Sequence, residues 1–144
     1  MTDDEAWAFL AAGHTGILTT LRADGFPVTL PVWFVVVDGA VLVAGPAHTK
    51  KFVRVRRDDR CSFLVEEGER WAELRAVQLT GRAEIVAEPD WEGADALFDA
   101  KYAAYRTPRA SMPERTQAHY GAGRELLAIR PGGRLLTWDN RRLR

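Results

Sequence analysis

The residues best suited to do chemistry in this sequence are Thr49, Lys50 and Lys51, which open a strongly basic segment. The two lysines are conspicuous, because 17 of the chain's 20 basic residues are arginines. They follow a strand-like stretch that ends at Gly45-Pro46, and they begin a short predicted helix. A threonine hydroxyl, two ammonium groups and the N–H groups of a first helical turn are a suitable set for holding a phosphate. The alternative for the same residues is a basic helix face exposed to solvent.

The positive charge of the chain is local. Six of the 20 basic residues lie between Lys50 and Arg60 beside two acids, whereas the formal net charge of the whole chain is zero. A local patch suits a small anionic ligand better than a long polyanion, so we expect no nucleic-acid partner.

Signals for other kinds of chemistry are missing. The three histidines are dispersed, and no Cys-x-x-Cys or His-Glu-x-x-His pattern occurs, so we expect no metal site. Gly-x-Ser-x-Gly, Walker and Rossmann loops are also absent, and no nucleophile stands beside a base. We therefore assign no catalytic side chain.

The elements that must position the basic segment are mostly strands. Asp24-Gly25 and Asp38-Gly39 are hairpin-turn signals between β-rich stretches. Helix patterns include a stripe of aromatic residues, Trp91, Phe98, Tyr102 and Tyr105, which we interpret as packing, with a position at a substrate opening as the alternative for Tyr105. The predicted strands are 17–21, 26–37, 40–45, 61–65, 71–86 with a bulge at Gly81, 125–130 and 134–138. Two prolines at positions 27 and 31 imply an edge, a bulge or a bend within 26–37. The predicted helices are 3–12, 49–58 and one that starts at Pro89, and residues 107–123 are loop-like.

Short turns between successive strands predict antiparallel pairing, and this many strands favours closure into a small barrel. The chain has 144 residues, of which 47% are hydrophobic and 28% charged, as expected for one globular domain spanning 1–144. The predicted fold is mainly β (α+β), a six- to seven-stranded antiparallel barrel with peripheral helices.

Sequence features also favour a cytoplasmic location. The single cysteine, Cys61, stands in an apolar context and is expected to be a buried thiol in a reducing compartment. The N-terminus is acidic and lacks the positive region of a signal peptide, and no apolar run is long enough for a membrane helix.

Several motifs together resemble one protein family. Residues 16–34, Gly-Ile-Leu-Thr-Thr-Leu-Arg-Ala-Asp-Gly-Phe-Pro-Val-Thr-Leu-Pro-Val-Trp-Phe, resemble the opening of the pyridoxamine 5′-phosphate oxidase-like split β-barrel proteins. Residues 51–60 are similar to their basic motif, and residues 79–85, Leu-Thr-Gly-Arg-Ala-Glu-Ile, to a later strand. The ending at 136–143 resembles the actinobacterial flavin/deazaflavin oxidoreductase branch. The resemblance covers nearly the whole chain and is weakest over 105–123.

The resemblance implies an FMN-binding type of split barrel and a homodimer whose two cofactor sites lie at the subunit interface. The cofactor would be coenzyme F420, a deazaflavin, or FMN, with its phosphate on the lysine that Lys51 matches. Two departures from the family motif are Arg54, where asparagine is usual, and Asp59, where proline is usual. The implied cofactor-binding residues are Val32 and Trp33 beside the ring, Thr49, Lys50, Lys51 and Arg54 near the phosphate, and Trp71 as a substitute for the family's stacking aromatic.

The expected activity is hydride transfer from bound F420 to a small conjugated or electron-poor substrate. In such enzymes the cofactor carries the chemistry, and the protein positions it and excludes water. Two alternatives remain open at this point, an FMN-dependent oxidoreductase and a non-catalytic flavin or deazaflavin carrier.

Overall fold

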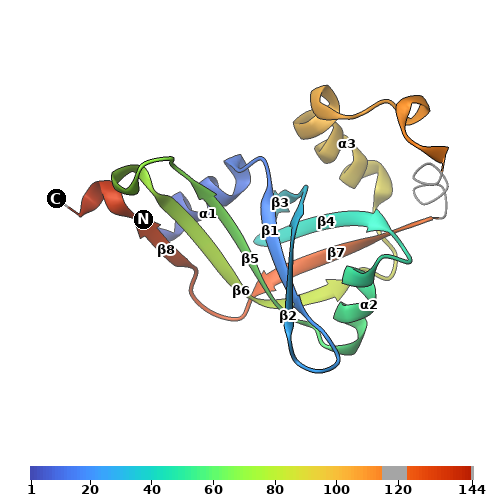
Figure 1. Ribbon diagram of the computed structural model, residues 1–144, viewed down its shortest axis with the longest axis horizontal. Coiled ribbons are helices and arrows are strands. Elements are labelled where there is room, and N and C mark those ends of the chain that lie inside the picture. Colours follow the sequence, from blue (N-terminus) through green and yellow to red (C-terminus); the bar gives the residue numbers. More distant parts are fainter. Residues whose placement is uncertain (115–122, 144) are drawn as a thin grey trace.

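The computed structural model describes residues 1–114 and 123–143, and within them it contains one antiparallel sheet with helices around it (Figure 1). The predicted loop at 107–123 therefore lies partly outside the described residues. The strands are β1 (Gly16–Leu21), β2 (Pro27–Val32), β3 (Val35–Val37), β4 (Ala40–Pro46), β5 (Arg60–Glu67), β6 (Arg75–Ile85), β7 (Arg124–Pro131) and β8 (Leu136–Asp139). The helices are α1 (Asp3–Ala12), α2 (Lys50–Arg57) and α3 (Trp91–Tyr102), with short 3₁₀ turns η1 (Trp71–Glu73), η2 (Ala103–Tyr105), η3 (Arg109–Ser111) and η4 (Asn140–Arg142).

The sheet is curled, and its two edge strands follow each other in the sequence. The strand order is β2-β1-β5-β6-β7-β4-β3, and β8 pairs with β6 beside β7. Because β2 and β3 stand at opposite ends of this order, the two residues between them, Trp33 and Phe34, connect the two edges. This arrangement confirms the predicted antiparallel barrel of mainly β class.

The single strand predicted at 26–37 is wrong, because it breaks at Trp33-Phe34 into β2 and β3. The Phe34 side chain is fully buried, and its backbone N–H donates to the Tyr102 hydroxyl instead of a neighbouring strand. This break and the short β8 give eight described strands where six to seven were expected.

Gly81 does not form the predicted bulge. The β5–β6 register runs without interruption from Arg60↔Arg82 to Glu67↔Arg75. Gly81 serves a close approach instead, since a Cβ atom at this position would lie 1.9 Å from the Arg130 carbonyl oxygen of β7. The predicted strand also begins later, because residues 71–73 form the 3₁₀ turn η1.

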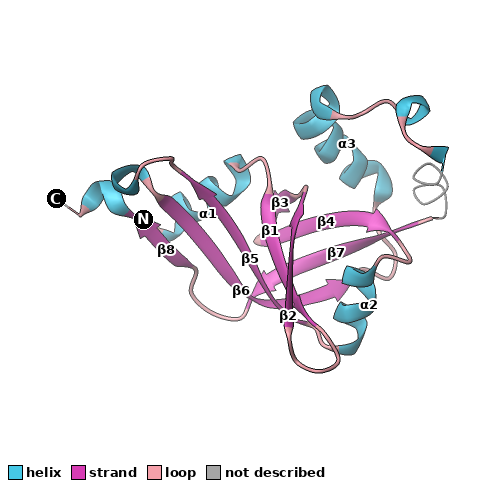
Figure 2. Cartoon of the chain, viewed as in Figure 1, coloured by secondary structure: helices cyan, strands magenta, loops and turns pink. Residues whose placement is uncertain are grey.

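α1 and α3 begin where polar side chains accept hydrogen bonds from the first backbone N–H groups. Thr2 and Glu5 form a reciprocal capping box at α1, and Asp90 caps α3, so Pro89 precedes that helix and is not its first residue. α2 and α3 lie near the β4 end of the sheet, and β8 and η4 lie at the opposite end (Figure 2). No helix among the described residues is both long and apolar enough to cross a membrane.

Two groups of buried side chains hold these layers together. Cys61 is buried as predicted, with Phe34, Phe52 and Phe63 in the larger group inside the sheet. A second group, Val35, Phe98 and Tyr102, packs α3 on the outer face of β3 and β4. The second group matters for function because it forms one wall of a cavity.

Candidate functional site

A cavity of about 590 Å³ lies between the sheet and α3. Its floor comes from the ends of β2 and β4, its wall from α3, and its rim from the segment after α3 and the start of β7. The lining residues are Leu30, Pro31, Val32, Trp33, Ala44, Gly45, Pro46, Lys51, Asp95, Phe98, Tyr105, Arg106, Thr107, Met112, Gly123 and Arg124. Three of the residues predicted from the sequence, Val32, Trp33 and Lys51, are therefore brought together.

Lys51 reaches the cavity because β4 carries a glycine at the point of contact. A Cβ atom on Gly45 would lie 2.9 Å from the Lys51 Nζ atom, so a larger residue would displace the ammonium group. The same ammonium lies 5.0 Å from the centre of the Phe52 ring and donates to the Thr49 hydroxyl at 3.3 Å. Sequence reasoning identified Gly45 only as a strand end and missed this role.

The Lys51 ammonium is half-buried and forms no ion pair within the described residues. Burial, and secondly the nearby Arg54 guanidinium, lower its pKa below the ordinary value. A cation that has lost water and faces a second cation is stabilised by any anion that enters the cavity. The site is therefore built to bind a negatively charged group.

The remaining cations of α2 divide into paired and unpaired groups. Arg56 forms an ion pair with Glu125, which removes it from the set available to a ligand. Arg54 donates from Nε to the fully buried Thr20 hydroxyl at 2.7 Å, and Arg57 donates to the Leu21 carbonyl. Neither of these two has a carboxylate partner among the described residues, so Arg54 leaves positive charge beside Lys51, and Arg57 leaves it beside Arg54.

Lys50 and Thr49 behave differently from the phosphate-binding trio expected from the sequence. Lys50 is exposed and does not line the cavity. Thr49 occupies the N-cap position of α2, but its hydroxyl donates to the Pro46 carbonyl at 2.9 Å and makes no capping bond. The lysine pair is thus separated by the helix into a cavity-facing Lys51 and a solvent-facing Lys50.

Trp33 gives the cavity an aromatic surface whose orientation is fixed from behind. Its ring stacks on Tyr102 with a centroid distance of 4.4 Å and an interplanar angle of 7°. Tyr102 is fully buried at the end of α3, where it was predicted to serve only packing. The tyrosine hydroxyl was the sequence signal for this supporting role, but Tyr105 in the same stripe carries one as well.

The rim of the cavity carries two ion pairs that hold β7 and η2 against α3. Arg124 donates to both carboxylate oxygens of Asp95 at 2.7 and 2.8 Å, and Arg106 pairs with Asp99. Tyr105 also lines this rim and is 62% exposed. From the sequence, Tyr105 was the alternative candidate for the substrate opening, and it does line the cavity. The ion-paired residues come from α3 and its surroundings, so the local patterns around the basic motif gave no indication of them.

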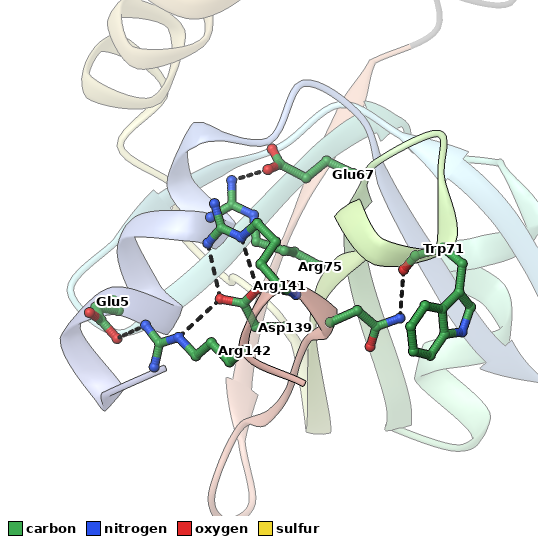
Figure 3. A network of polar contacts seen from close by, with 8 residues as sticks. Glu5, Glu67, Trp71, Arg75, Asp139, Arg141 and Arg142 are labelled. Carbon is green, nitrogen blue, oxygen red and sulfur yellow. Dashed lines mark hydrogen bonds and ion pairs between the residues drawn. The ribbon is translucent and has the colours of Figure 1, made fainter. Parts of the chain in front are cut away.

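Trp71 is not brought to this cavity. It lies in η1 with 67% of its surface exposed, at the end of the molecule that holds β8 and η4. Its carbonyl accepts a hydrogen bond from the Asn140 side chain at 2.8 Å (Figure 3). Beside it, Asp139 pairs with Arg141 and Arg142, and Arg142 reaches Glu5 of α1.

Comparisons with known proteins agree with this architecture. The F420H(2)-dependent biliverdin reductase of Mycobacterium tuberculosis (strain CDC 1551 / Oshkosh) is 36% identical over 112 residues, with 74% of each chain covered. The crystal structure of the conserved hypothetical protein Rv2991 from Mycobacterium tuberculosis has a TM-score of 0.77 at 32% identity, covering 99% of this chain and 88% of its own. A structure named F420 Reductase has a TM-score of 0.66 at 22% identity, covering 90% and 94%, and supports the fold alone.

A family model described as pyridoxamine 5′-phosphate oxidase matches residues 2–133. This match confirms the resemblance carried by the motifs at 16–34 and 51–60, and with it the expected oxidoreductase class. Since the match spans nearly the whole sequence, the chain belongs to the pyridoxamine 5′-phosphate oxidase family.

Proposed function

We propose that this protein is a reductase that binds coenzyme F420 in the cavity between β2, β4 and α3. The observation that carries the proposal is the Lys51 ammonium, which is half-buried, lies beside Arg54 and has no ion-pair partner among the described residues. The relative named as an F420H(2)-dependent biliverdin reductase supports this cofactor. FMN is the rival cofactor because it carries a phosphate on a similar ring system.

The residues present fit such a group. A volume of about 590 Å³ lies within the usual range for ligand pockets. Lys51 would hold the phosphate, with Arg54 beside it. The N-terminal end of α2, with Thr49 and Lys50, would lie near the same group. Val32 and Trp33 would face the ring, since both line the same cavity. Bound in reduced form, the cofactor supplies a hydride for an acceptor.

The tasks left to the protein are binding, orientation and exclusion of water. Leu30, Val32 and Phe98 give the cavity an apolar surface, which lowers the local dielectric around the reacting atoms. Trp33 presents a ring surface against which a flat molecule can stack. We assign no proton donor among these residues, in keeping with the sequence-based expectation.

The charge along α2 favours a cofactor with more than one negative group. Lys51, Arg54 and Arg57 follow one another at intervals of three residues, so they lie along one helix face. An anionic chain attached to the phosphate would run along this face from the cavity toward the end of β1, where Arg57 contacts Leu21. This feature supports F420, with its acidic tail, over FMN.

We further propose that the chain forms one domain, residues 1–144, and that two copies form a homodimer with a cofactor site completed by each partner. The supporting observation is an exposed apolar face at the β8 end, which we call the β8 face. It consists of Trp71, Leu74, Leu136, Trp138 and Leu143, exposed by 67%, 39%, 52%, 45% and 66%. A patch of this kind on a small protein is typical of an interface. Trp71 of the partner subunit would then reach a site that it cannot reach within its own chain.

Small conjugated acceptors are the proposed substrates, and biliverdin is the first to test because the 36% identical relative is named for it. The cofactor proposal is tested by titrating the protein with F420 and with FMN while recording cofactor fluorescence. We expect micromolar or tighter binding of F420, and binding of neither cofactor would overturn the proposal.

Catalysis is tested separately from binding. Reduced F420 is mixed with the protein and a panel of conjugated acceptors that includes biliverdin, and the return of the oxidised cofactor's absorbance is followed. Turnover above the protein-free rate is the expected result. Tight binding without turnover of any acceptor would favour the carrier alternative.

A further inference from the structure

The link between β2 and β3 is held by two adjacent residues at the end of α3, Lys101 and Tyr102. Trp33 and Phe34 form this link, and Trp33 faces the cavity while the Phe34 side chain enters the core. The two residues of this link belong to no strand of the described chain, so no hydrogen bonds to a neighbouring strand fix their position. Its backbone groups are bonded to side chains instead, which makes the position of Trp33 depend on α3.

The Tyr102 hydroxyl makes the first set of contacts. It accepts a hydrogen bond from the Phe34 N–H at 3.0 Å, and it lies 2.8 Å from the His14 carbonyl and 2.9 Å from the Phe34 carbonyl, either of which can accept its proton. The Tyr102 ring stacks on Trp33 at the same time. One side chain therefore fixes both the backbone of the link and the plane of the Trp33 ring.

The Lys101 ammonium makes the second set of contacts. It donates to the Phe34 carbonyl at 3.0 Å and to the Ala11 carbonyl at the end of α1 at 3.3 Å. It also lies 3.7 Å from the centre of the Phe34 ring, within the range of a cation–π interaction. No carboxylate pairs with it among the described residues, so its partners are the link and the end of α1.

We propose that Lys101 and Tyr102 are positioning residues that set the orientation of Trp33 in the cavity and thereby the affinity for the cofactor ring. The link to the cofactor rests on the proposed function, whereas the effect on Trp33 does not. His14 and Tyr105 complete the surroundings, since the His14 ring lies 5.4 Å from Tyr102 and 4.5 Å from Tyr105, edge to face. Among the described residues, the side chains bonded to the Phe34 backbone are those of Lys101 and Tyr102, which leaves the holding role to α3.

The first test observes Trp33 without any cofactor. The protein is labelled with 5-fluorotryptophan, and the Trp33 resonance among its five tryptophans is assigned with Trp33→Phe. We expect Lys101→Met and Tyr102→Phe to shift or broaden the Trp33 resonance selectively. Arg130→Met removes an exposed cation that pairs with Glu84, and it should leave that resonance in place. An unchanged Trp33 resonance in both variants would overturn the proposal.

The second test measures F420 affinity of the same proteins. We expect a loss of about tenfold in each α3 variant, the scale of a lost hydrogen bond to a charged or buried group, and none in Arg130→Met. Tyr102→Phe keeps the ring stack and guards against a folding defect in Lys101→Met. If the wild-type protein binds no cofactor, the proposed function fails while the resonance test still decides the positioning role. If it binds and both variants bind equally well, the positioning role fails alone.

Discussion

Lys51 and Lys101 are both half-buried lysines, but their surroundings give them different roles. Lys101 donates to two backbone carbonyls and lies over an aromatic ring, so its N–H groups have partners within the fold although burial lowers its pKa. Lys51 has a threonine hydroxyl, an aromatic ring and a neighbouring guanidinium, and the cation beside it opposes its charge. The first lysine is therefore explained by structure, and the second calls for a ligand.

Lys101 is expected to make stability depend on pH. Burial lowers its pKa from 10.5 to about 8 in the folded protein. Below pH 8 both the folded and unfolded states carry the proton, and between about 8 and 10.5 the unfolded state alone retains it, so the free energy of unfolding rises with pH there. We expect this rise to be on the order of 1 kcal/mol, after allowance for solvent screening of a half-exposed ammonium.

The measurement compares urea denaturation of the wild-type protein and Lys101→Met from neutral to alkaline pH. Burial also raises the pKa of Cys61, to about 12, which lowers stability as the unfolded thiol ionises, but this effect is common to both proteins and cancels in the difference. The difference in free energy of unfolding should move in favour of the wild type as pH rises. A difference that stays constant with pH would contradict the assignment.

The contact between β4 and α2 is the element-scale feature on which the site depends. Gly45 lets the Lys51 ammonium lie against the strand, because a Cβ atom there would approach Nζ to 2.9 Å. The closest contact is with the end of a flexible side chain, and the buried Phe52 ring at 3.3 Å must shift only slightly, so Gly45→Ala should displace Lys51 and keep the fold. We expect F420 affinity to fall by roughly 1 kcal/mol with little change in melting temperature.

Gly132→Ala is the matched control for this substitution. A Cβ atom at Gly132 would meet its nearest neighbours at 3.8 Å, which is ordinary contact, so neither affinity nor melting temperature should change. Isothermal titration and thermal denaturation of the two variants separate the outcomes. Equal affinities for Gly45→Ala and the wild type would show that the position of Lys51 does not govern binding.

An element could be predicted where residues close to it in the sequence determine its limits. α1 was predicted within its limits because Thr2, Glu5 and Gly13 define its ends through local hydrogen bonds. The prolines of 26–37 indicated an edge or a bend, but not the position of the break at Trp33-Phe34, where the Phe34 backbone bonds to Tyr102, 68 residues away. Likewise, Lys51 stood out by residue type, whereas the role of Gly45 emerges only when β4 and α2 pack together. Trp71 was grouped with the site by motif alone, and the fold places it at the end of the molecule opposite the cavity.

At the scale of the whole molecule, the cavity and the β8 face lie at opposite ends of the sheet. Leu136 and Trp138 pair with Gln78 and Ala76 of β6, so these four residues point to the same side of the sheet. Exposed large apolar side chains on a strand and on the 3₁₀ turn η1 at the same end of the molecule are typical of an interaction surface. A second copy whose cavity side packs against the β8 face would cover this face and bring Trp71 to the cavity of that copy.

Leu136→Asp should therefore convert a dimer of the 16.1 kDa chain into a monomer, because a charge would be buried without a partner in the interface. Light scattering coupled to size-exclusion chromatography reports the mass directly. Leu97→Asp is the control, since Leu97 is similarly exposed at 43% but belongs to α3, away from the β8 face. A dimeric Leu136→Asp variant would place the interface elsewhere. A monomeric wild-type protein would contradict the homodimer itself.

The central claim is that Lys51 binds the phosphate of a deazaflavin cofactor, and one fluorescence titration tests it most directly. The wild-type protein and Lys51→Ala are titrated with F420, and Lys50→Ala serves as the neighbouring lysine that faces solvent. We expect the Lys51 substitution to weaken binding by about 1.5–3 kcal/mol, the scale of a charge-assisted hydrogen bond, and the Lys50 substitution to weaken it less. Folding should not suffer, because removing Lys51 also removes its repulsion with Arg54. Equal affinity of the wild-type protein and Lys51→Ala for F420 would contradict the claim.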